Sequence, residues 1–241
     1  MLEYQSASTF YLFNFDQPKT NQAHFFQPDF WRGENRLSGS AQGRGTTYFV
    51  QSEDWFGVNC ALRHYYRGGL IGKFNKDLFL FKNLAKTRSF AEFRLLARLQ
   101  QAGLPVPKPI GARVQKVGIF YRADLLSQRI ENARDLTDLL QREQLTPAQW
   151  QQIGALIRRL HDLQICHSDL NAHNILCQQK GNETQFWLID FDKCGERAGE
   201  DWKAENLQRL HRSFIKEIGR MAIQFSPQNW ADLLSGYQDK K

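Results

Sequence analysis

The feature that most constrains this chain is a set of three polar residues at fixed spacing in its second half. Asp169 and Asn174 lie five positions apart in the stretch HSDLNAHNIL, and Asp190 follows sixteen positions later in LIDFD. The two apolar stretches between Asn174 and Asp190 are separated by QQKGNET, whose composition is typical of a hairpin loop. The spacing therefore predicts a loop and a hairpin that bring three polar side chains to one place.

The stretch before this loop has the pattern of a well-defined helix. Thr146-Pro147-Ala148-Gln149 has the composition of a capping box with proline at the first helical position. Apolar residues then recur at helical spacing to about Leu163. Asp169, Asn174 and Asp190 could each be an ordinary cap or turn residue. All three in this order, after a capped helix and on both sides of a predicted hairpin, are difficult to explain in that way.

The chemistry of these residue types fits transfer of a phosphoryl group. The reaction needs a carboxylate that orients the attacking hydroxyl and accepts its proton, and Asp169 suits that task. It also needs oxygen ligands that hold Mg²⁺ on the phosphates of ATP, and Asn174 and Asp190 suit that task. The pattern H-x-D-x-x-x-x-N, followed by a strand that ends in D-F, resembles the catalytic core of the protein-kinase-like fold.

Two upstream features agree with this resemblance. The stretch GSAQGRG, with Gly43 and Gly45, precedes a strand-like run and resembles a loop whose backbone covers phosphates. Arg63 stands where such folds usually place the strand lysine that contacts the α- and β-phosphates, and Glu92 stands in the place of its acidic partner.

The resemblance is imperfect, and the departures bear on the ligands. Because arginine replaces lysine at position 63, Arg67 and Lys73 remain alternative candidates for the phosphate contact. Ser168 replaces the arginine that reads a phosphorylated activation loop, and Asp192 replaces the glycine of D-F-G. The segment after Asp192 is short and lacks an A-P-E motif. These departures favour a compact kinase that acts on a small or lipid-linked hydroxyl.

The order of the predicted elements is mostly strands followed by mostly helices. The pattern predicts strands at 46–50, 58–66 and 117–126, helices at 88–101 and 133–141, and two helices after Lys203 with a break near Pro227. This order predicts an α+β, protein-kinase-like two-lobed fold. It would have a small sheet-rich N-lobe over residues 1–128, a compact helical C-lobe over residues 129–241 and a cleft between them.

The charge of the chain favours an anionic partner. Lys and Arg number 32 against 25 Asp and Glu, which gives a net charge of +7. Basic residues alternate with aromatic residues between Arg63 and Arg88, a mix that suits an anionic bilayer surface or a phosphorylated lipid headgroup as well as it suits a solvated face. No nucleic-acid-binding motif accompanies them, so no nucleic-acid partner is expected.

Two further features point to the cytoplasm. No stretch approaches the roughly 18–20 apolar residues of a membrane helix, and the first residues lack the pattern of a secretory signal. The four cysteines show no C-x-x-C spacing, which predicts reduced thiols rather than a zinc or redox site.

Four stretches together resemble the lipopolysaccharide kinase family: GRGTTYFV, ALRHYYRGGLIGK, HSDLNAHNIL and LIDFDK. The resemblance extends from about Gly39 to the last helices. It implies ATP- and Mg²⁺-dependent phosphorylation of the 4-OH of 3-deoxy-D-manno-octulosonic acid (Kdo) in the anionic glycolipid Kdo-lipid IVA, a step of lipopolysaccharide core biosynthesis. It also implies a peripheral protein on the cytoplasmic side of the cell inner membrane.

Three alternatives remain open at this point. The chain could be a kinase for a small molecule of the aminoglycoside or choline type, a non-catalytic pseudokinase that binds a partner, or a basic nucleic-acid-binding module. Asp169, Asn174 and Asp190 argue against the pseudokinase because a binding module does not need all three. The nucleic-acid module leaves this acidic motif unexplained.

Overall fold

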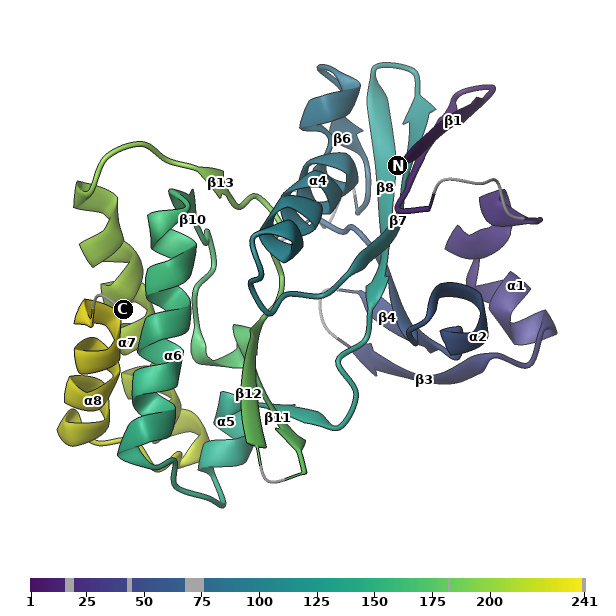
Figure 1. The fold of residues 1–241 in the computed structure, drawn as a ribbon. Helices are drawn as coiled ribbons and strands as arrows, with labels where there is room; N and C mark the ends of the chain where they lie inside the picture. The colour runs from purple at the N-terminus through teal and green to yellow at the C-terminus, as the bar shows by residue number, and fades with distance from the viewer. Residues whose placement is uncertain (16–19, 43–44, 68–75, 182, 240–241) are drawn as a thin grey trace. The chain divides into compact units, whose positions relative to one another are not determined.

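The computed structural model describes residues 1–15, 20–42, 45–67, 76–181 and 183–239. Backbone contacts divide the chain into two units (Figure 1). Unit 1 comprises residues 1–97 and 107–129, and unit 2 comprises residues 98–106 and 130–241.

Unit 1 is built on an eight-stranded antiparallel sheet in which the strand order is β1-β2-β7-β8-β5-β4-β3, with β6 paired to β8. The strands are β1 (Leu2–Ser6), β2 (Thr9–Phe13), β3 (Leu37–Gln42), β4 (Thr46–Val50), β5 (Cys60–His64), β6 (Phe79–Leu80), β7 (Pro109–Val117) and β8 (Phe120–Gln128). The strand predicted at 46–50 is confirmed.

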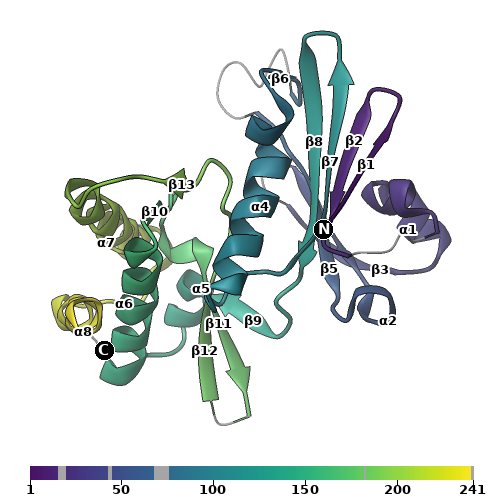
Figure 2. The same ribbon diagram turned by 45° about the horizontal axis from the view of Figure 1, so that its top comes forward.

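The single strand predicted at 117–126 is wrong. Gly118 has a φ of +59° and turns the chain, so that β7 ends at Val117 and β8 begins at Phe120. The apolar run continues across this turn, and one glycine gave too weak a signal to divide it. The result is the long β7–β8 hairpin, whose turn lies at one end of the sheet (Figure 2).

Short helices and one long helix complete unit 1. They are η1 (Gln22–Phe26), α1 (Pro28–Gly33), α2 (Glu53–Phe56), η2 (Leu84–Lys86) and α4 (Arg88–Gln101), the last of which continues into unit 2. The helix predicted at 88–101 is confirmed, and its apolar stripe, which includes Phe90, Phe93 and Leu96, is buried.

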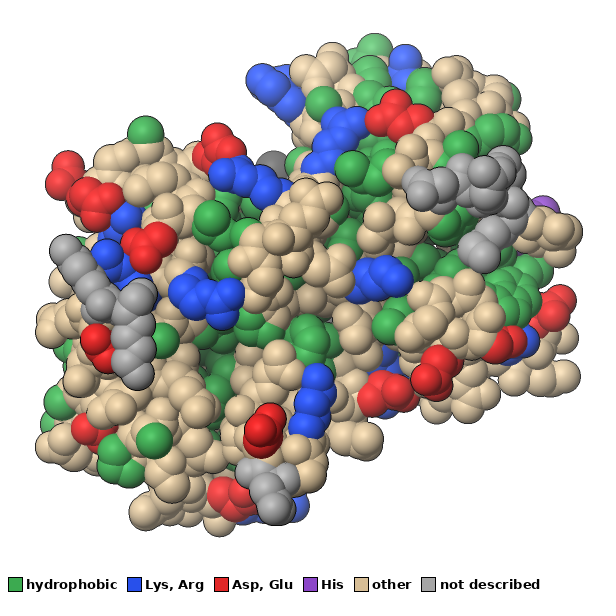
Figure 3. Space-filling view, in the orientation of Figure 1, with side chains coloured by type: hydrophobic (Ala, Val, Ile, Leu, Met, Phe, Trp, Pro, Cys, Tyr) green, Lys and Arg blue, Asp and Glu red, His purple; other side chains and the backbone are tan. Residues whose placement is uncertain are grey.

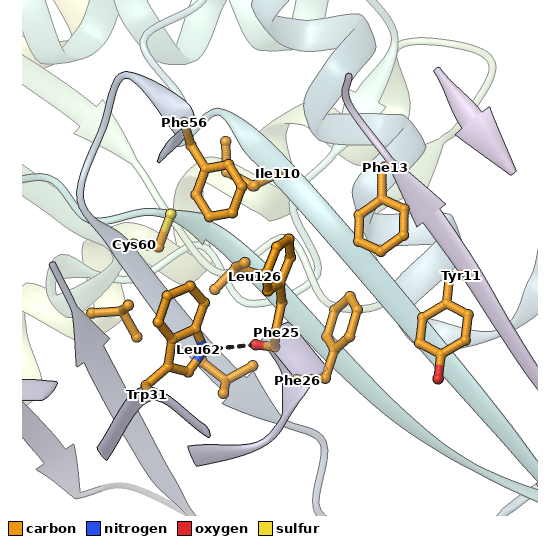
Figure 4. Packing of buried hydrophobic residues seen from close by; sticks show 11 residues of the cluster. Tyr11, Phe13, Phe25, Phe26, Trp31, Phe56, Cys60, Leu62, Ile110 and Leu126 are labelled. Atoms are coloured by element: carbon orange, nitrogen blue, oxygen red, sulfur yellow. Dashed lines mark hydrogen bonds between the residues drawn. The ribbon is translucent and has the colours of Figure 1, made fainter. Parts of the chain in front are cut away.

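One face of the sheet is covered by aromatic residues from the first part of the chain (Figure 4). Phe25 and Phe26 of η1 and Trp31 of α1 pack in one cluster with Phe13 of β2 and Leu62 of β5. The buried indole of Trp31 donates a 2.8 Å hydrogen bond to the carbonyl oxygen of Phe25. Residues 1–38 lack a clear sequence period because their apolar side chains come from several short elements rather than from one amphipathic element.

Unit 2 contains three long helices, α6 (Pro147–Asp162), α7 (Asp201–Met221) and α8 (Pro227–Gln238). The predicted capping box is confirmed: the Thr146 hydroxyl accepts from the Gln149 backbone N–H, and the Gln149 side chain accepts from the Thr146 N–H. The two helices predicted after Lys203, with a break near Pro227, are also confirmed.

Helices α6 and α8 lie side by side (Figures 1 and 2) and approach each other at two glycines. A Cβ atom on Gly154 would lie 1.9 Å from the carbonyl oxygen of Leu233, and one on Gly236 would lie 2.0 Å from the carbonyl oxygen of Gln151. Only residues without a side chain permit this spacing, so the contact is fixed at both helices.

The rest of unit 2 consists of short elements around the predicted hairpin. They are β9 (Ala133–Asp135), α5 (Leu136–Leu140), β10 (Ile165–Cys166), η3 (Ala172–Asn174), β11 (Ile175–Lys180), β12 (Glu183–Leu188) and β13 (Gly195–Glu196). The β11–β12 hairpin is confirmed. The helix predicted at 133–141 begins three residues late, because 133–135 pair with β11 and Asp135 then caps α5.

Candidate active site

A buried histidine holds the loop that carries Asp169. His167 is fully buried, and its Nε2 lies 3.0 Å from the carbonyl oxygen of Ile189, while its Nδ1 lies 3.3 Å from the backbone nitrogen of Asp169. The neutral tautomer with the proton on Nε2 satisfies both bonds, because Nε2–H donates and Nδ1 accepts. Burial lowers the pKa of His167, which favours this neutral ring.

Asp169 and Asn174 are tied together by a side-chain hydrogen bond. The Asn174 amide nitrogen donates to the carbonyl oxygen of Asp169 at 2.9 Å, and the Asn171 amide nitrogen donates to the same oxygen at 3.0 Å. Asn171 also caps η3, because its Oδ1 accepts from the backbone N–H groups of His173 and Asn174. The Asp169 carboxylate itself is exposed.

A backbone hydrogen bond places Asp190 beside Asn174. The N–H of Ile189 donates to the carbonyl oxygen of Asn174 at 3.0 Å, so the residue after Ile189 leaves the hairpin beside Asn174. Asp190 has a φ of +62°, a left-handed conformation that is uncommon for a residue with a side chain. Such strained positions are often found at functional sites. The structure thus makes Asp169, Asn174 and Asp190 neighbours through these backbone and side-chain bonds; their shared role at one site stays a prediction.

The donor set suits a hard divalent cation. The side-chain nitrogen of Asn174 is held by Asp169, and its Oδ1 accepts no hydrogen bond from the residues that the structure describes. That oxygen and the Asp190 carboxylate are ligands of the kind that Mg²⁺ prefers. Two protein ligands are enough for a Mg²⁺ ion that takes its remaining ligands from phosphates and water.

A series of hydrogen-bonded side chains connects the backbone of this loop to helices α6, α7 and α8. The carbonyl oxygen of His167 accepts from the Asn206 amide nitrogen at 2.8 Å, and Asn206 Oδ1 lies 3.1 Å from His161 Nε2. The Nδ1 of His161 lies 2.8 Å from the Tyr237 hydroxyl. With Nε2 protonated, His161 donates to Asn206 and accepts from Tyr237. Burial lowers the pKa of His161 to about 4, so the ring is neutral at physiological pH.

The residues after Asp190 also pack against the loop. Phe191 is fully buried with its ring centroid 4.9 Å from that of His167. The hydroxyl of Ser168 donates to the carbonyl oxygen of Asp192 at 2.9 Å. Ser168, which replaces the expected arginine, therefore joins the two segments of the site through a backbone contact.

In unit 1, Arg63 and Glu92 form an ion pair. Arg63 lies on β5 and Glu92 on α4, and the Nη2 of Arg63 is 2.6 Å from both carboxylate oxygens of Glu92. The Glu92 side chain is only 3% exposed, whereas that of Arg63 is 27% exposed. The pairing is the one expected of a strand cation and its helical acid.

Tyr65 also contacts this ion pair, and no motif in the sequence predicted that role. Its hydroxyl donates to Glu92 Oε2 at 2.6 Å, and the Arg63 guanidinium carbon lies 4.8 Å from the centre of its ring. Burial raises the pKa of Tyr65 well above its usual value, and the nearby Glu92 carboxylate acts in the same direction. The neutral hydroxyl is thus retained as a donor.

Unit 1 also contains the other residues predicted to contact phosphates, and the structure describes two of them, Arg67 and Gly45. Arg67 is occupied by packing, because its Nε donates to the Leu78 carbonyl oxygen at 2.5 Å and its guanidinium lies over the Phe79 ring. A Cβ on Gly45 would lie 2.1 Å from the Tyr66 ring, so any larger residue at this position would require the ring to move. Gly43 and Lys73 lie outside the described residues.

Two further residues at the site could not be found by motif. Arg209 of α7 places its Nη1 3.3 Å from Asp169 Oδ1, and Asn206 of the same helix holds the backbone of His167. Both lie about forty positions after the loop that they contact, in a helix without a recognisable motif. Only the packing of the helix on the loop identifies them.

Comparison with known proteins gives consistent results. The sequence profile of the "Lipopolysaccharide kinase (Kdo/WaaP) family" matches residues 28–237. Proteins named 3-deoxy-D-manno-octulosonic acid kinase are similar over nearly the whole chain. The one from Mannheimia succiniciproducens is 68% identical over 99% of this chain and 100% of its own, and the one from Actinobacillus succinogenes is 61% identical over the same shares. The one from Photobacterium profundum is 50% identical over 88% of both chains.

Among solved structures, the chain is similar to one described as WaaP in complex with acyl carrier protein. The TM-score is 0.56 at 14% sequence identity, and the match covers 88% of this chain and 86% of the other. At this identity the likeness concerns the fold, and it confirms the predicted α+β, protein-kinase-like fold.

Proposed function

The chain belongs to the lipopolysaccharide kinase (Kdo/WaaP) family, and on this premise we propose that it is a 3-deoxy-D-manno-octulosonic acid kinase. It transfers the γ-phosphoryl group of ATP to the 4-OH of the Kdo residue in Kdo-lipid IVA. The observation that carries the proposal is the convergence of Asp169, Asn174 and Asp190 on one loop and hairpin of unit 2. This set can serve both tasks of the reaction, which are activation of a hydroxyl and retention of a metal–nucleotide complex.

Asp169 is the residue that acts on the acceptor. Its carboxylate is exposed, whereas its backbone is held by His167, Asn171 and Asn174. It orients the acceptor hydroxyl and takes its proton as the bond from the acceptor oxygen to the γ-phosphorus forms and the bond from that phosphorus to ADP breaks. A fixed backbone keeps the carboxylate in the geometry that this displacement needs.

Asn174 and Asp190 would hold Mg²⁺, which would neutralise charge on the β- and γ-phosphates. The tie between the Asn174 nitrogen and Asp169 directs the amide so that its oxygen remains as the ligand atom. Arg63, held by Glu92 and Tyr65, is proposed to contact the α- and β-phosphates of ATP. Gly43 and Gly45 are proposed to take part in phosphate binding as well, since a glycine has no Cβ to keep a phosphate from the backbone.

We place the protein at the cytoplasmic side of the inner membrane as a peripheral protein. None of the helices in the described parts of the chain is long and apolar enough to cross a membrane. Three large apolar side chains are exposed where β6 meets the β7–β8 hairpin: Leu80 at 54%, Val117 at 39% and Ile119 at 68%. We call these three residues the apolar tip. Lys82 and Lys86 are exposed near it in sequence, and Lys116 precedes Val117.

The combination of an apolar tip with nearby cations suits an anionic bilayer. At the upper end of unit 1 in Figure 3, hydrophobic side chains lie beside Lys and Arg side chains. Some of the basic residues between Arg63 and Arg88 make contacts within the protein instead of forming an open anion-binding surface. Arg63 pairs with Glu92, and both Arg67 and Arg88 stack on Phe79.

Mass spectrometry of the acceptor after incubation with ATP and Mg²⁺ tests the proposed reaction. We expect Kdo-lipid IVA to gain the mass of one phosphate group, and aminoglycosides and choline to remain unmodified in parallel incubations. Phosphorylation of a soluble amino alcohol in place of the glycolipid would refute the proposed acceptor. Nucleotide binding without turnover on any acceptor would instead indicate a pseudokinase.

A further inference from the structure

Helix α7 lies against the catalytic loop along one row of side chains. Arg209 contacts Asp169 at 3.3 Å, the Ser213 hydroxyl accepts from the Ala172 N–H at 3.0 Å, and Glu217 lies 3.7 Å from His173. These three helix residues are spaced by four and therefore share one side of α7. Along α7 they contact, in order, Asp169, Ala172 and His173 of the loop.

The exposed cations of α7 lie next to this row. They are Arg209, Arg212, Lys216 and Arg220, which we call the cationic row. At 100° per residue they fall within an arc of about 80°, and Arg209 belongs to both rows. The remaining basic side chain of this fully described helix, apart from His211, is Lys203, which is buried. All exposed Lys and Arg of α7 therefore lie on the side of the helix that borders the catalytic loop.

The row is only partly neutralised. Arg209 pairs with Asp169, and Arg220 lies 3.5 Å from Glu217. Arg212 and Lys216 form no ion pair with any residue that the structure describes. The exposed acids on this side, Asp201 and Glu205, lie in the first turns of α7, before Arg209. Because like charges four positions apart destabilise a helix, the spacing of Arg212, Lys216 and Arg220 is unfavourable for the isolated protein.

We propose that the cationic row binds the anionic groups of the acceptor glycolipid. The inference rests on the proposed function and names the part of the protein that recognises its substrate. The row is about 16 Å long at a rise of 1.5 Å per residue. It begins at Asp169, so an acceptor whose hydroxyl lies at Asp169 can place phosphate or carboxylate groups along it. A ligand with several separate negative charges fits this length better than one with a single charge.

Arg212 and Lys216 are the residues to test, because neither forms an ion pair or a side-chain hydrogen bond with the catalytic loop as the structure describes it. The variant Arg212→Gln/Lys216→Gln removes two charges from the row. The matched control Arg142→Gln/Arg197→Gln removes two exposed charges elsewhere in unit 2. The measurements are the KM for Kdo-lipid IVA in detergent micelles, the KM for ATP and kcat.

We expect the KM for Kdo-lipid IVA to rise at least about tenfold in the row variant, since a contact between a cation and a phosphate is worth about a factor of ten or more. Its KM for ATP and its kcat should stay within about twofold of wild type, because uniform binding of the acceptor is what has been lost. The control should keep all three values. With an acceptor from which the lipid phosphates have been removed enzymatically, the wild type and the row variant should converge.

An unchanged KM for the glycolipid in the row variant would overturn the inference. So would an equal loss of affinity for acceptor-free vesicles of phosphatidylglycerol, since that result would make the row a general membrane surface. Binding of Kdo-lipid IVA micelles without ATP separates this inference from the proposed reaction. If binding depends on the row but the wild type never phosphorylates the glycolipid, the proposed reaction fails and the binding row stands.

Discussion

At the scale of single residues, the site depends on side chains that fix one another's protonation and direction. His167 can accept from the Asp169 N–H only while its ring is neutral, and burial keeps it so. Asn174 presents its oxygen because its nitrogen is already bound to the backbone of Asp169. His167 and Asn174 are therefore each oriented by a hydrogen bond, and in Asn174 this bond leaves the side-chain oxygen as the atom that can bind a ligand.

The role of Asp169 predicts a large loss of activity without a loss of structure. Asp169→Asn keeps the size of the side chain but cannot take the acceptor proton, so we expect kcat to fall by about 10³-fold or more. Acceptor phosphorylation measures the effect, and circular dichroism reports on the fold. Asp162→Asn on α6 is the matched control because Asp162 is an exposed carboxylate paired with Arg158, and it should retain full activity. Near-normal turnover by Asp169→Asn would remove Asp169 from this role.

The lowered pKa of His161 predicts that the protein becomes less stable as the pH falls. Its pKa in the folded protein is about 4, against an ordinary value of 6.5, so the unfolded chain binds the proton first as the pH falls. The contribution of the neutral ring is fully present above pH 6.5 and is lost between pH 6.5 and about 4. From pH 7 to pH 5 the loss should be about 2 kcal/mol of unfolding free energy.

Urea unfolding of wild type and His161→Gln at both pH values checks this. Glutamine can donate to Asn206 but does not titrate, so the difference in stability between the two proteins should shrink as the pH falls. A constant difference from pH 7 to pH 5 would contradict the assignment. Because His161 is joined to His167 through Asn206, turnover in mild acid should decline in the wild type before the protein unfolds.

At the scale of elements, sequence patterns predicted those parts whose signal is local. Helices α4 and α6 were predicted with accurate bounds because each has an apolar stripe and α6 has a complete capping box. Asp169, Asn174 and Asp190 were predicted to meet because one loop and one hairpin carry all three. The turn at Gly118 and the pairing of 133–135 with β11 were missed, since a turn within an apolar run and a short strand leave little trace in sequence.

The contacts between elements were not predictable. Asn206, Arg209 and Tyr237 reach the loop, or the residues behind it, only through the packing of α6, α7 and α8. Tyr65 likewise joins Arg63 and Glu92 through the packing of α4 on the sheet. Periodicity identifies the buried side of a helix but not the neighbour that it meets.

The close contact between α6 and α8 predicts opposite effects of the same substitution at two helical glycines. Gly236→Ala would place a methyl group 2.0 Å from a backbone oxygen of α6, and we expect it to lower the free energy of unfolding by about 3 kcal/mol or more. Gly219→Ala in α7 meets nothing within 4 Å and should stabilise the protein by about 0.5–1 kcal/mol. Denaturant unfolding measures both, and equal effects would contradict the described packing.

At the scale of the whole molecule, the chain combines a net charge of +7 with local surfaces of distinct character. The family profile matches residues 28–237, so the aromatic residues of β2 and η1 that cover the sheet lie before the matched segment. The apolar tip belongs to unit 1 and the cationic row to unit 2. The proposed membrane contact and the proposed acceptor recognition therefore involve different residues, so substitutions can test them separately.

The apolar tip predicts salt-sensitive binding to anionic vesicles. We expect the protein to sediment with vesicles containing phosphatidylglycerol, less so with phosphatidylcholine alone, and less at about 0.5 M than at about 0.1 M salt. Ile119→Glu should abolish most of this binding because it places a charge at the most exposed apolar side chain of the tip. Ile215→Glu on α7, at a similarly exposed isoleucine, is the control, and an equal loss there would show that the tip is not the contact.

The two facing glycines of α6 and α8 also limit how sequences of this kind can diverge. A methyl group gained at position 154 or 236 is excluded until the helices have moved apart, and that movement would withdraw the Tyr237 hydroxyl from His161. A substitution at position 154 or 236 alone would therefore disturb the hydrogen bonds that connect Tyr237, through His161 and Asn206, to the loop that carries Asp169. In a lineage of such proteins, the two positions are therefore expected to be inherited together, and to change only alongside compensating replacements in the opposite helix.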